Sequence, residues 1–208
     1  MTVRHAISGF YAVLDRDDEA LARALVREAR VLQVRVKPRG GRADSGELVR
    51  IARMARRICD NAGAALIVND RLDVALAADA DGVHLGQTDL PIAAARRISG
   101  DLWIGISTHD VAQVRAACEA GADYVGFGPV FATTTKHDPS PLVGLAGLAG
   151  LRAAVAEATA AGRPVVAIGG ITPAVAAEVY EAGADAICAI SAVNDARDPA
   201  DTARQFRR

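Results

Sequence analysis

Short runs of apolar residues, many of them β-branched, alternate along the chain with longer segments that have helical spacing. The apolar runs predict strands at residues 9–14, 31–36, 64–68, 81–85, 102–107, 123–128, 164–168 and 186–190. The other segments predict helices at residues 17–29, 45–61, 71–80, 111–120, 147–161, 173–182 and 199–208, and one that begins at Pro91. A strand-helix-strand repeat makes the strands parallel, so we expect an α/β fold.

The repeat continues through all 208 residues without a linker or a change in composition. Eight strands alternating with eight helices favour one domain over residues 1–208, closed into a (β/α)8 TIM barrel. A doubly wound open sheet is the alternative that the length also allows. Glycine with alanine or aspartate recurs at 63–64, 80–82, 121–123 and 183–185, which predicts structural turns from a helix into the next strand.

Polar residues gather where the predicted strands end, which is where α/β sheets hold their binding and catalytic groups. Alternation in the second strand places Gln33, Arg35 and Lys37 on one face. In a closed barrel, these three share one rim with residues that follow the other strands. Those residues are Asn69, Asp70, Gln87, Asp89, Ser107, His109, Thr133, Thr135, Lys136, Gly169, Gly170, Ile190 and Ser191.

Two carboxylates, Asp70 and Asp89, follow neighbouring predicted strands, and Asn69 stands beside the first of them. Converging carboxylates repel each other unless a cation or a proton relieves the repulsion. Magnesium prefers oxygen ligands, so a magnesium ion is the simplest hypothesis. For Asp70 alone, the alternative is a helix N-cap, because aspartate is common at that position.

A glycine pair, Gly169-Gly170, follows the seventh predicted strand and precedes a predicted helix. Such a pair exposes backbone N–H groups, and barrels of this kind commonly bind phosphate at the ends of strands seven and eight. Ser191 at the next strand end supports a phosphate site there. A simple tight turn is the alternative explanation for the two glycines.

Three cationic side chains, Arg35, Lys37 and Lys136, are candidates for neutralising a polyanion at the same rim. A basic residue on the inward face of a strand is unfavourable if it is buried without a partner. A structural ion pair of Arg35 with Asp15 or Asp70 is the alternative.

The remaining reactive residue types carry weaker functional signals. We expect His84, inside a predicted strand, to be a hydrogen-bonded structural residue rather than a catalyst. Cys59, Cys118 and Cys188 lie far apart and match no metal or redox spacing, so we expect reduced thiols that serve packing.

Overall composition excludes several classes of function. With 24 Lys and Arg against 25 Asp and Glu, the chain has no basic field for nucleic acid and no polybasic patch for a membrane surface. No run of 18 apolar residues and no signal-like N-terminal segment occurs, so a cytoplasmic location is the default expectation. The oligomeric state is left open.

Seven short motifs occur in order along nearly the whole chain. They are Gln33-x-Arg35-x-Lys37, Val68-Asn69-Asp70-Arg71, His84-Leu85-Gly86-Gln87-x-Asp89, Gly128-Pro129-Val130-Phe131, Thr133-x-Thr135-Lys136, Ala167-Ile168-Gly169-Gly170-Ile171 and Ile190-Ser191-Ala192. Together they closely resemble the motifs of the thiamine phosphate synthase family.

The resemblance implies a transferase of thiamine biosynthesis that requires Mg²⁺ and acts on two small molecules. It would join 4-amino-5-hydroxymethyl-2-methylpyrimidine diphosphate to 4-methyl-5-(2-phosphoethyl)thiazole, or to the carboxylate of that thiazole, and release pyrophosphate. The implied chemistry is dissociative: the diphosphate leaves first, and the thiazole nitrogen then captures a cation that the pyrimidine stabilises.

The resemblance also implies a role for each matching residue. Gln33, Arg35, Lys37, Asn69, Ser107 and Lys136 would bind the pyrimidine diphosphate, with Arg35, Lys37, Ser107 and Lys136 as the catalytic set. Asp70 and Asp89 would bind magnesium. The thiazole phosphate would be held by Thr133, Thr135, Gly170, Ile190 and Ser191.

Three positions depart from the family pattern: Val36 often has an acid, Ala132 a proline, and Val175 an asparagine. None of them removes a predicted binding group. Two alternatives remain. A thiazole tautomerase would resemble this chain but have a histidine where Pro129 stands, and a non-catalytic barrel that binds a phosphate ligand would not need both carboxylates.

Overall fold

A computed structural model describes residues 2–36, 44–132 and 145–208. Its strands are β1 (Gly9–Leu14), β2 (Ala29–Val34), β3 (Ala65–Asn69), β4 (Gly82–Leu85), β5 (Trp103–Thr108), β6 (Tyr124–Phe127), β7 (Val165–Ile168) and β8 (Ala186–Cys188). Its helices are α1 (Val3–Ala6), α2 (Glu19–Leu25), α3 (Ser45–Ala62), α4 (Leu72–Ala77), α5 (Ile92–Ser99), α6 (Val111–Glu119), α7 (Leu145–Ala160), α8 (Ala176–Glu181), α9 (Ser191–Asn194) and α10 (Pro199–Arg204). A short 3₁₀ turn, η1 (Pro173–Val175), precedes α8.

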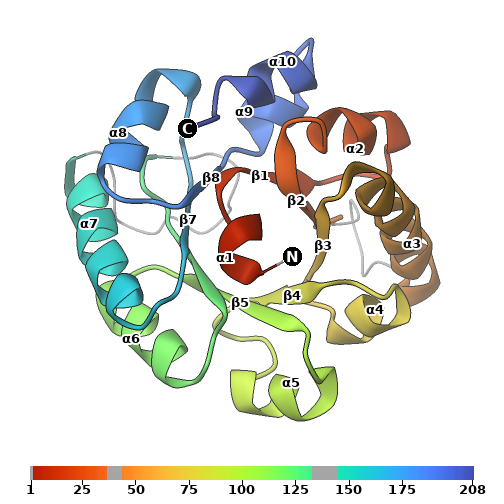
Figure 1. The fold of residues 1–208 in the computed structure, drawn as a ribbon, viewed down its shortest axis with the longest axis horizontal. Coiled ribbons are helices and arrows are strands. Elements are labelled where there is room, and N and C mark those ends of the chain that lie inside the picture. Colours follow the sequence, from red (N-terminus) through yellow and green to blue (C-terminus); the bar gives the residue numbers. More distant parts are fainter. Residues whose placement is uncertain (1, 37–43, 133–144) are drawn as a thin grey trace.

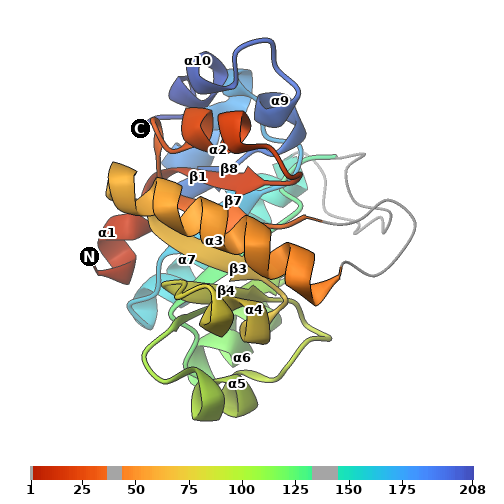
Figure 2. The same ribbon diagram turned by 90° about the vertical axis from the view of Figure 1, so that its right-hand side faces the viewer.

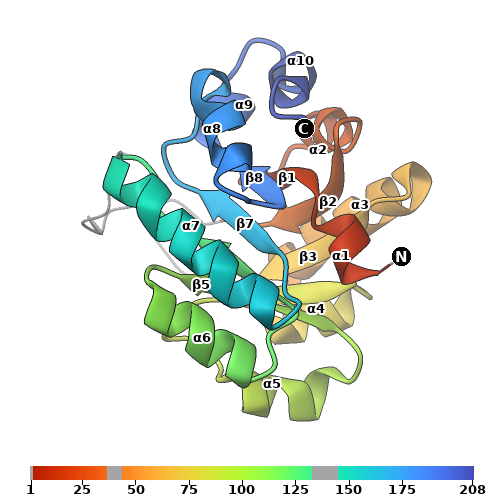
Figure 3. The same cartoon turned by 60° about the vertical axis from the view of Figure 1, so that its left-hand side comes forward.

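The strands form one closed parallel barrel in the order of the sequence. Each strand pairs with the next, and Gly9 and Phe10 of β1 pair with Ala186 and Ile187 of β8 to close the ring. Figure 1 shows the ring of strands surrounded by helices, and Figure 3 shows α6 and α7 side by side on one flank. The predicted (β/α)8 barrel is confirmed, and the open sheet is excluded.

Alternation along the strands divides the apolar residues into two separate cores. Tyr11 and Val13 of β1 belong to the core inside the barrel, whereas Ala12 and Leu14 pack in the core between strands and helices. The same division holds for Ile67 and its neighbours in β3. On each strand, the alternate residues that belong to the inner core, such as Tyr11 and Val13, therefore point toward the barrel axis.

Helix α1, which the apolar pattern did not predict, closes the amino-terminal end of the barrel. Ala6 and Ile7 are buried in the inner core, and Figure 2 shows α1 at the end where the strands begin. A four-residue helix is too short to display a helical period, so its only local signal is Thr2, whose hydroxyl accepts a hydrogen bond from the His5 N–H.

The recurring aspartates before even-numbered strands have the predicted structural role. One carboxylate oxygen of Asp81 accepts a hydrogen bond from the Leu66 N–H at 2.7 Å. Asp123 accepts a bond from the Ile104 N–H at 2.8 Å, and Asp185 accepts one from the Val165 N–H at 2.9 Å. Each aspartate thus pairs a backbone donor at the beginning of the neighbouring strand.

Element boundaries differ from the predicted ones at the second and eighth strands. β2 ends at Val34, two residues early, and β8 ends at Cys188. After β8 the chain turns into the unpredicted helix α9, where the buried Asn194 side chain donates to the Val13 carbonyl at 2.9 Å. This long-range contact stabilises a helix that has almost no periodicity of its own.

All three cysteines are free thiols, as predicted, with Cys59 and Cys188 buried. No helix in the described ranges combines the length and the apolar content that crossing a bilayer requires.

Glycine at position 105 leaves room for a tyrosine inside the barrel. A Cβ atom at Gly105 of β5 would lie 2.1 Å from Cζ and 2.5 Å from the hydroxyl oxygen of Tyr124 on β6. Tyr124 is fully buried. The small residue on one strand therefore accommodates the large residue on its neighbour.

We expect Gly105→Ala to destabilise the barrel by about 1–3 kcal/mol, because the added methyl group overpacks the inner core. Gly46→Ala is the matched control: its Cβ would meet only the Asp44 carboxylate, at 3.6 Å, and alanine favours the helix. Urea unfolding of both variants measures the two effects. Equal stabilities would show that the inner core adapts to the methyl group.

Candidate active site

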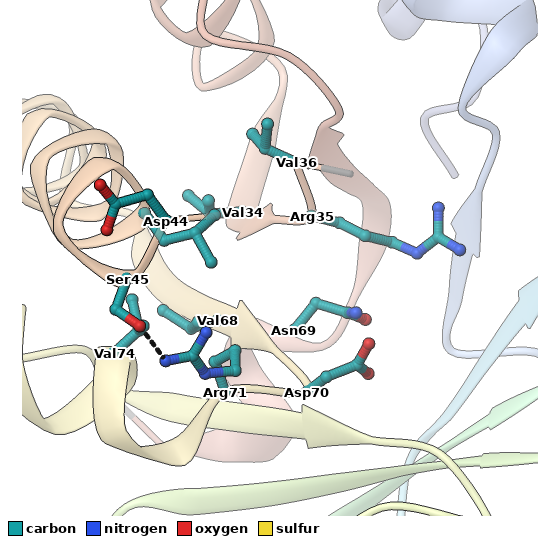
Figure 4. Close-up of a pocket in the computed structure, with 11 residues that line it drawn as sticks. Val34, Arg35, Val36, Asp44, Ser45, Val68, Asn69, Asp70, Arg71 and Val74 are labelled. Atoms are coloured by element: carbon teal, nitrogen blue, oxygen red, sulfur yellow. Dashed lines mark hydrogen bonds between the residues drawn. The ribbon is translucent and has the colours of Figure 1, made fainter. Parts of the chain in front are cut away.

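The carboxyl ends of β2 and β3 place Arg35, Asn69 and Asp70 side by side at the mouth of the barrel. Arg35 extends β2 by one residue, since its N–H donates to the Leu14 carbonyl at 2.8 Å. Figure 4 shows the three side chains pointing the same way, away from helix α3. They border a cleft of about 720 Å³ whose other lining residues are Val34, Val36, Asp44, Ser45, Leu48, Val68, Arg71 and Val74.

Arg35 is half-buried and has no carboxylate partner within the described residues. The alternative of a structural pair with Asp15 is wrong, because Asp15 lies 3.3 Å from Arg16 instead. Burial raises the pKa of the Cys188 thiol to about 12, and the charge of Arg35 opposes that rise. The charge of the guanidinium therefore reaches the end of β8.

Asp70 adopts a left-handed backbone conformation, with φ of 60°, directly after β3. Its N–H donates to the His84 carbonyl of β4 at 2.8 Å. Helix α4 has Arg71 at its N-cap position, so the N-cap alternative for Asp70 is wrong. A non-glycine residue in this conformation is strained, and such strain is concentrated at functional sites.

Asp89, the second predicted metal ligand, lies in the loop after β4. One of its carboxylate oxygens accepts a hydrogen bond from the Gly86 N–H at 2.6 Å, which holds the loop in a turn. Asp89 therefore has a local structural role besides any role toward a ligand.

Arg71 connects the beginnings of α3 and α4 beside this pair of strands. Its guanidinium donates to the Ser45 hydroxyl at 2.8 Å (Figure 4). Through Nε, it also donates to Asp73 at 2.8 Å. Hydrogen bonds from Arg71 lower the pKa of Asp73. The arrangement keeps the Arg71 charge away from the carboxylate of the neighbouring Asp70.

A chain of hydrogen bonds crosses the barrel interior beneath the mouth. The Gln33 amide donates to the Tyr11 hydroxyl at 2.9 Å, and the Tyr11 and Tyr124 hydroxyls lie 2.9 Å apart. Tyr124 reaches Nδ1 of His84 at 3.0 Å, and Nε2 of His84 lies 2.9 Å from the Ser107 hydroxyl. Two predicted binding residues, Gln33 and Ser107, are therefore linked through the core.

The expectation that His84 is hydrogen-bonded is confirmed, since both ring nitrogens have partners. Sequence reasoning missed Tyr11 and Tyr124. Tyr11 shares inward parity with Val13, which was the available signal, but nothing in the pattern shows that the two hydroxyls meet.

The glycine pair after β7 packs tightly against the segment that follows β6. Gly169 and Gly170 have φ of 99° and 64°, and a Cβ at Gly170 would lie 2.3 Å from the Ala132 carbonyl oxygen. Two constraints thus require glycine at this position. Across from them, Ile190 is the N-cap of α9 and Ser191 its first residue.

Four predicted site residues lie outside the described residues: Lys37, Thr133, Thr135 and Lys136. Among residues 2–36, 44–132 and 145–208, no three His, Cys, Asp or Glu side chains gather in a way that would hold a metal ion. A metal bound by Asp70 and Asp89 would need further oxygen atoms, which water or a ligand could supply.

Known proteins resemble this chain over most of its length. The family described as thiamine monophosphate synthase matches residues 7–193. A thiamine-phosphate synthase of Chloroflexus aurantiacus is 48% identical over 184 residues, which are 88% of this chain and 81% of the relative. One from Salinibacter ruber is 42% identical over 205 residues, covering 98% of this chain and 86% of the relative.

A solved structure has the same fold. Thiamine phosphate pyrophosphorylase from Pyrococcus furiosus superposes with a TM-score of 0.86 at 34% identity, covering 99% of this chain and 96% of the other. Sequence and structure agree over the whole barrel, so this chain belongs to the thiamine monophosphate synthase family.

Proposed function

We propose that this chain joins 4-amino-5-hydroxymethyl-2-methylpyrimidine diphosphate to 4-methyl-5-(2-phosphoethyl)thiazole, or to its carboxylate, and releases pyrophosphate, together with carbon dioxide when the carboxylate is used. Membership of a family of transferases supports the proposal. The single observation that carries it is the half-buried Arg35, which faces the mouth beside Asn69 and Asp70 without a described carboxylate partner. A cation held this way stabilises a ligand with concentrated negative charge.

The pyrimidine diphosphate is assigned to the β2, β3 and β5 side of the mouth. Arg35 and Asn69 would contact it there. Ser107 of β5 would join them, since it shares the inward parity of Trp103. Gln33 is only 5% exposed, so it would contribute from the floor of the site. Lys37 and Lys136 complete this set as sequence predictions.

The donor chemistry of Asp70 and Asp89 fits a magnesium ion. Magnesium is usually bound by one or two carboxylates together with phosphate oxygens of the substrate, which agrees with a pair of aspartates at neighbouring strand ends. When bound, the ion would screen the negative charge of the diphosphate.

The thiazole phosphate is assigned to the β7 and β8 side, at Gly170, Ile190 and Ser191, with Thr133 and Thr135 from the loop after β6. The tight approach of Ala132 to Gly170 brings the beginning of that loop next to the end of β7. This support is geometric. The assignment of the phosphate itself rests on the resemblance.

The reaction breaks the bond between the pyrimidine methylene carbon and the diphosphate oxygen, and the electron pair leaves with pyrophosphate. The lone pair of the thiazole nitrogen then forms the new carbon-nitrogen bond. Arg35 acts where negative charge develops on the leaving group. Because the aromatic nitrogen carries a free lone pair, no side chain has to remove a proton.

We expect purified protein to release pyrophosphate and form thiamine phosphate only when both substrates and Mg²⁺ are supplied. Omitting each component in turn is the control. Thiazole phosphate binding without any pyrophosphate release would contradict the proposal, and would favour a tautomerase or a non-catalytic binding barrel.

We expect Asp70→Asn to fold normally and to lose turnover by about 10²–10³-fold, equivalent to about 2.7–4 kcal/mol in the barrier, because one preorganised charge is removed. Asp101→Asn is the matched control, since Asp101 is exposed in the turn that leads into β5. Initial rates over a range of Mg²⁺ concentrations test the pair. A near-normal rate of Asp70→Asn at low Mg²⁺ would refute the assigned role.

We expect Ser191→Asp to raise the KM for thiazole phosphate by about tenfold or more, because the new carboxylate repels the phosphate. The KM for the pyrimidine diphosphate should change little and serves as the internal control. If steady-state kinetics show the thiazole KM unchanged, the phosphate binds elsewhere.

A further inference from the structure

The hydrogen-bonded chain from Gln33 to Ser107 has a direction, because each hydroxyl group carries a single hydrogen. If the Gln33 amide nitrogen donates to Tyr11, as the structure has it, Tyr11 donates to Tyr124. Tyr124 then donates to Nδ1 of His84, which leaves the hydrogen of the imidazole on Nε2. His84 therefore donates to the Ser107 hydroxyl oxygen.

The hydrogen of the Ser107 hydroxyl then takes no part in this series of hydrogen bonds and can be donated to another acceptor. If the Gln33 side-chain amide were flipped, so that its oxygen and nitrogen exchanged places, every hydrogen bond in the series would reverse. Ser107 would then donate to His84. A diphosphate only accepts hydrogen bonds. A serine that binds it must donate, so the first direction agrees with the proposed substrate and the second does not.

The interior is built to hold this chain in one arrangement. Gln33, Tyr11 and Tyr124 are buried, at 5%, 3% and 0% exposure. Burial raises the pKa of both tyrosines, so both hydroxyl groups stay protonated.

Two glycines give the rings their space. A Cβ at Gly105 would collide with Tyr124, and one at Gly126 would lie 3.2 Å from the Cε1 atom of His84. The rings of His84 and Tyr124 are packed with centroids 5.5 Å apart. Their positions are therefore set by the strands and not by a ligand.

We propose that Tyr124 and His84 are positioning residues: Tyr124 donates to Nδ1 of His84 and keeps the imidazole hydrogen on Nε2, so that Ser107 donates its own hydrogen to the diphosphate of the substrate. The role of Ser107 toward substrate rests on the proposed function. The direction of the hydrogen bonds rests on the orientation of the Gln33 amide, whose nitrogen donates to Tyr11.

The first test reads the tautomer of His84 in the free protein. ¹⁵N NMR of histidine-labelled protein should show a protonated Nε2 and an unprotonated Nδ1 for His84, with His84→Gln used only to assign the signal. A hydrogen on Nδ1 would overturn the proposal. This measurement needs no substrate and no variant of the two tyrosines.

The second test is a double-mutant cycle on turnover. Ser107→Ala should lower kcat by about 100-fold, and Tyr124→Phe, which removes only the hydroxyl group, by about tenfold. In the Ser107→Ala background, Tyr124→Phe should lower kcat no further. Tyr180→Phe is the matched control, since its hydroxyl donates to the Phe206 carbonyl at 2.6 Å outside the inner core.

Equal losses from Tyr124→Phe in both backgrounds would mean that the hydroxyl acts on packing and not through Ser107, which contradicts the proposal. Tyr11→Phe is the second variant. Tyr124 keeps its hydrogen bond to His84 in this variant, so kcat should fall less than threefold. A loss as large as that of Tyr124→Phe would also contradict it. A wild-type protein that makes no thiamine phosphate would instead refute the proposed function, whatever the tautomer of His84.

Discussion

Closure of the sheet between β1 and β8 is the constraint on which the rest of the molecule depends. Because all the strands are parallel and lie in sequence order, closure brings every carboxyl end to one rim. It also creates an interior packed with buried side chains and closed at the other end by α1. Residues separated by more than a hundred positions, such as Tyr11 and Tyr124, become hydrogen-bond partners as a result.

A closed interior imposes a cost on every polar group placed inside it. Buried hydroxyl, amide and imidazole groups are unfavourable unless they pair, and here they pair with one another in a continuous chain. Arg35 differs, since it stands above these hydrogen bonds at the rim, half-buried, and forms no ion pair with a described carboxylate. The rim therefore presents the positive charge of Arg35 to a ligand, while the polar groups in the interior beneath it are hydrogen-bonded to one another.

Local patterns were sufficient where the physical cause was itself local. The apolar runs of β1 and β3 and the turn aspartates before β4, β6 and β8 were all predictable, since each depends on neighbouring residues. α1 and α9 escaped prediction because they are only four residues long and are held by contacts with the inner core and with Val13.

By itself, the sequence determined the barrel, its parity and the polar residues at its rim, because strand alternation and a repeated βα unit are encoded in residue order. It also carried the seven motifs that the family match supports. Only the tertiary structure decided between alternatives at single residues. Asp70 is not a helix cap, because its backbone is left-handed, and Arg35 has no partner in Asp15, because Arg16 occupies that carboxylate. Such outcomes depend on backbone conformation and on competition between side chains in space, which residue order does not express.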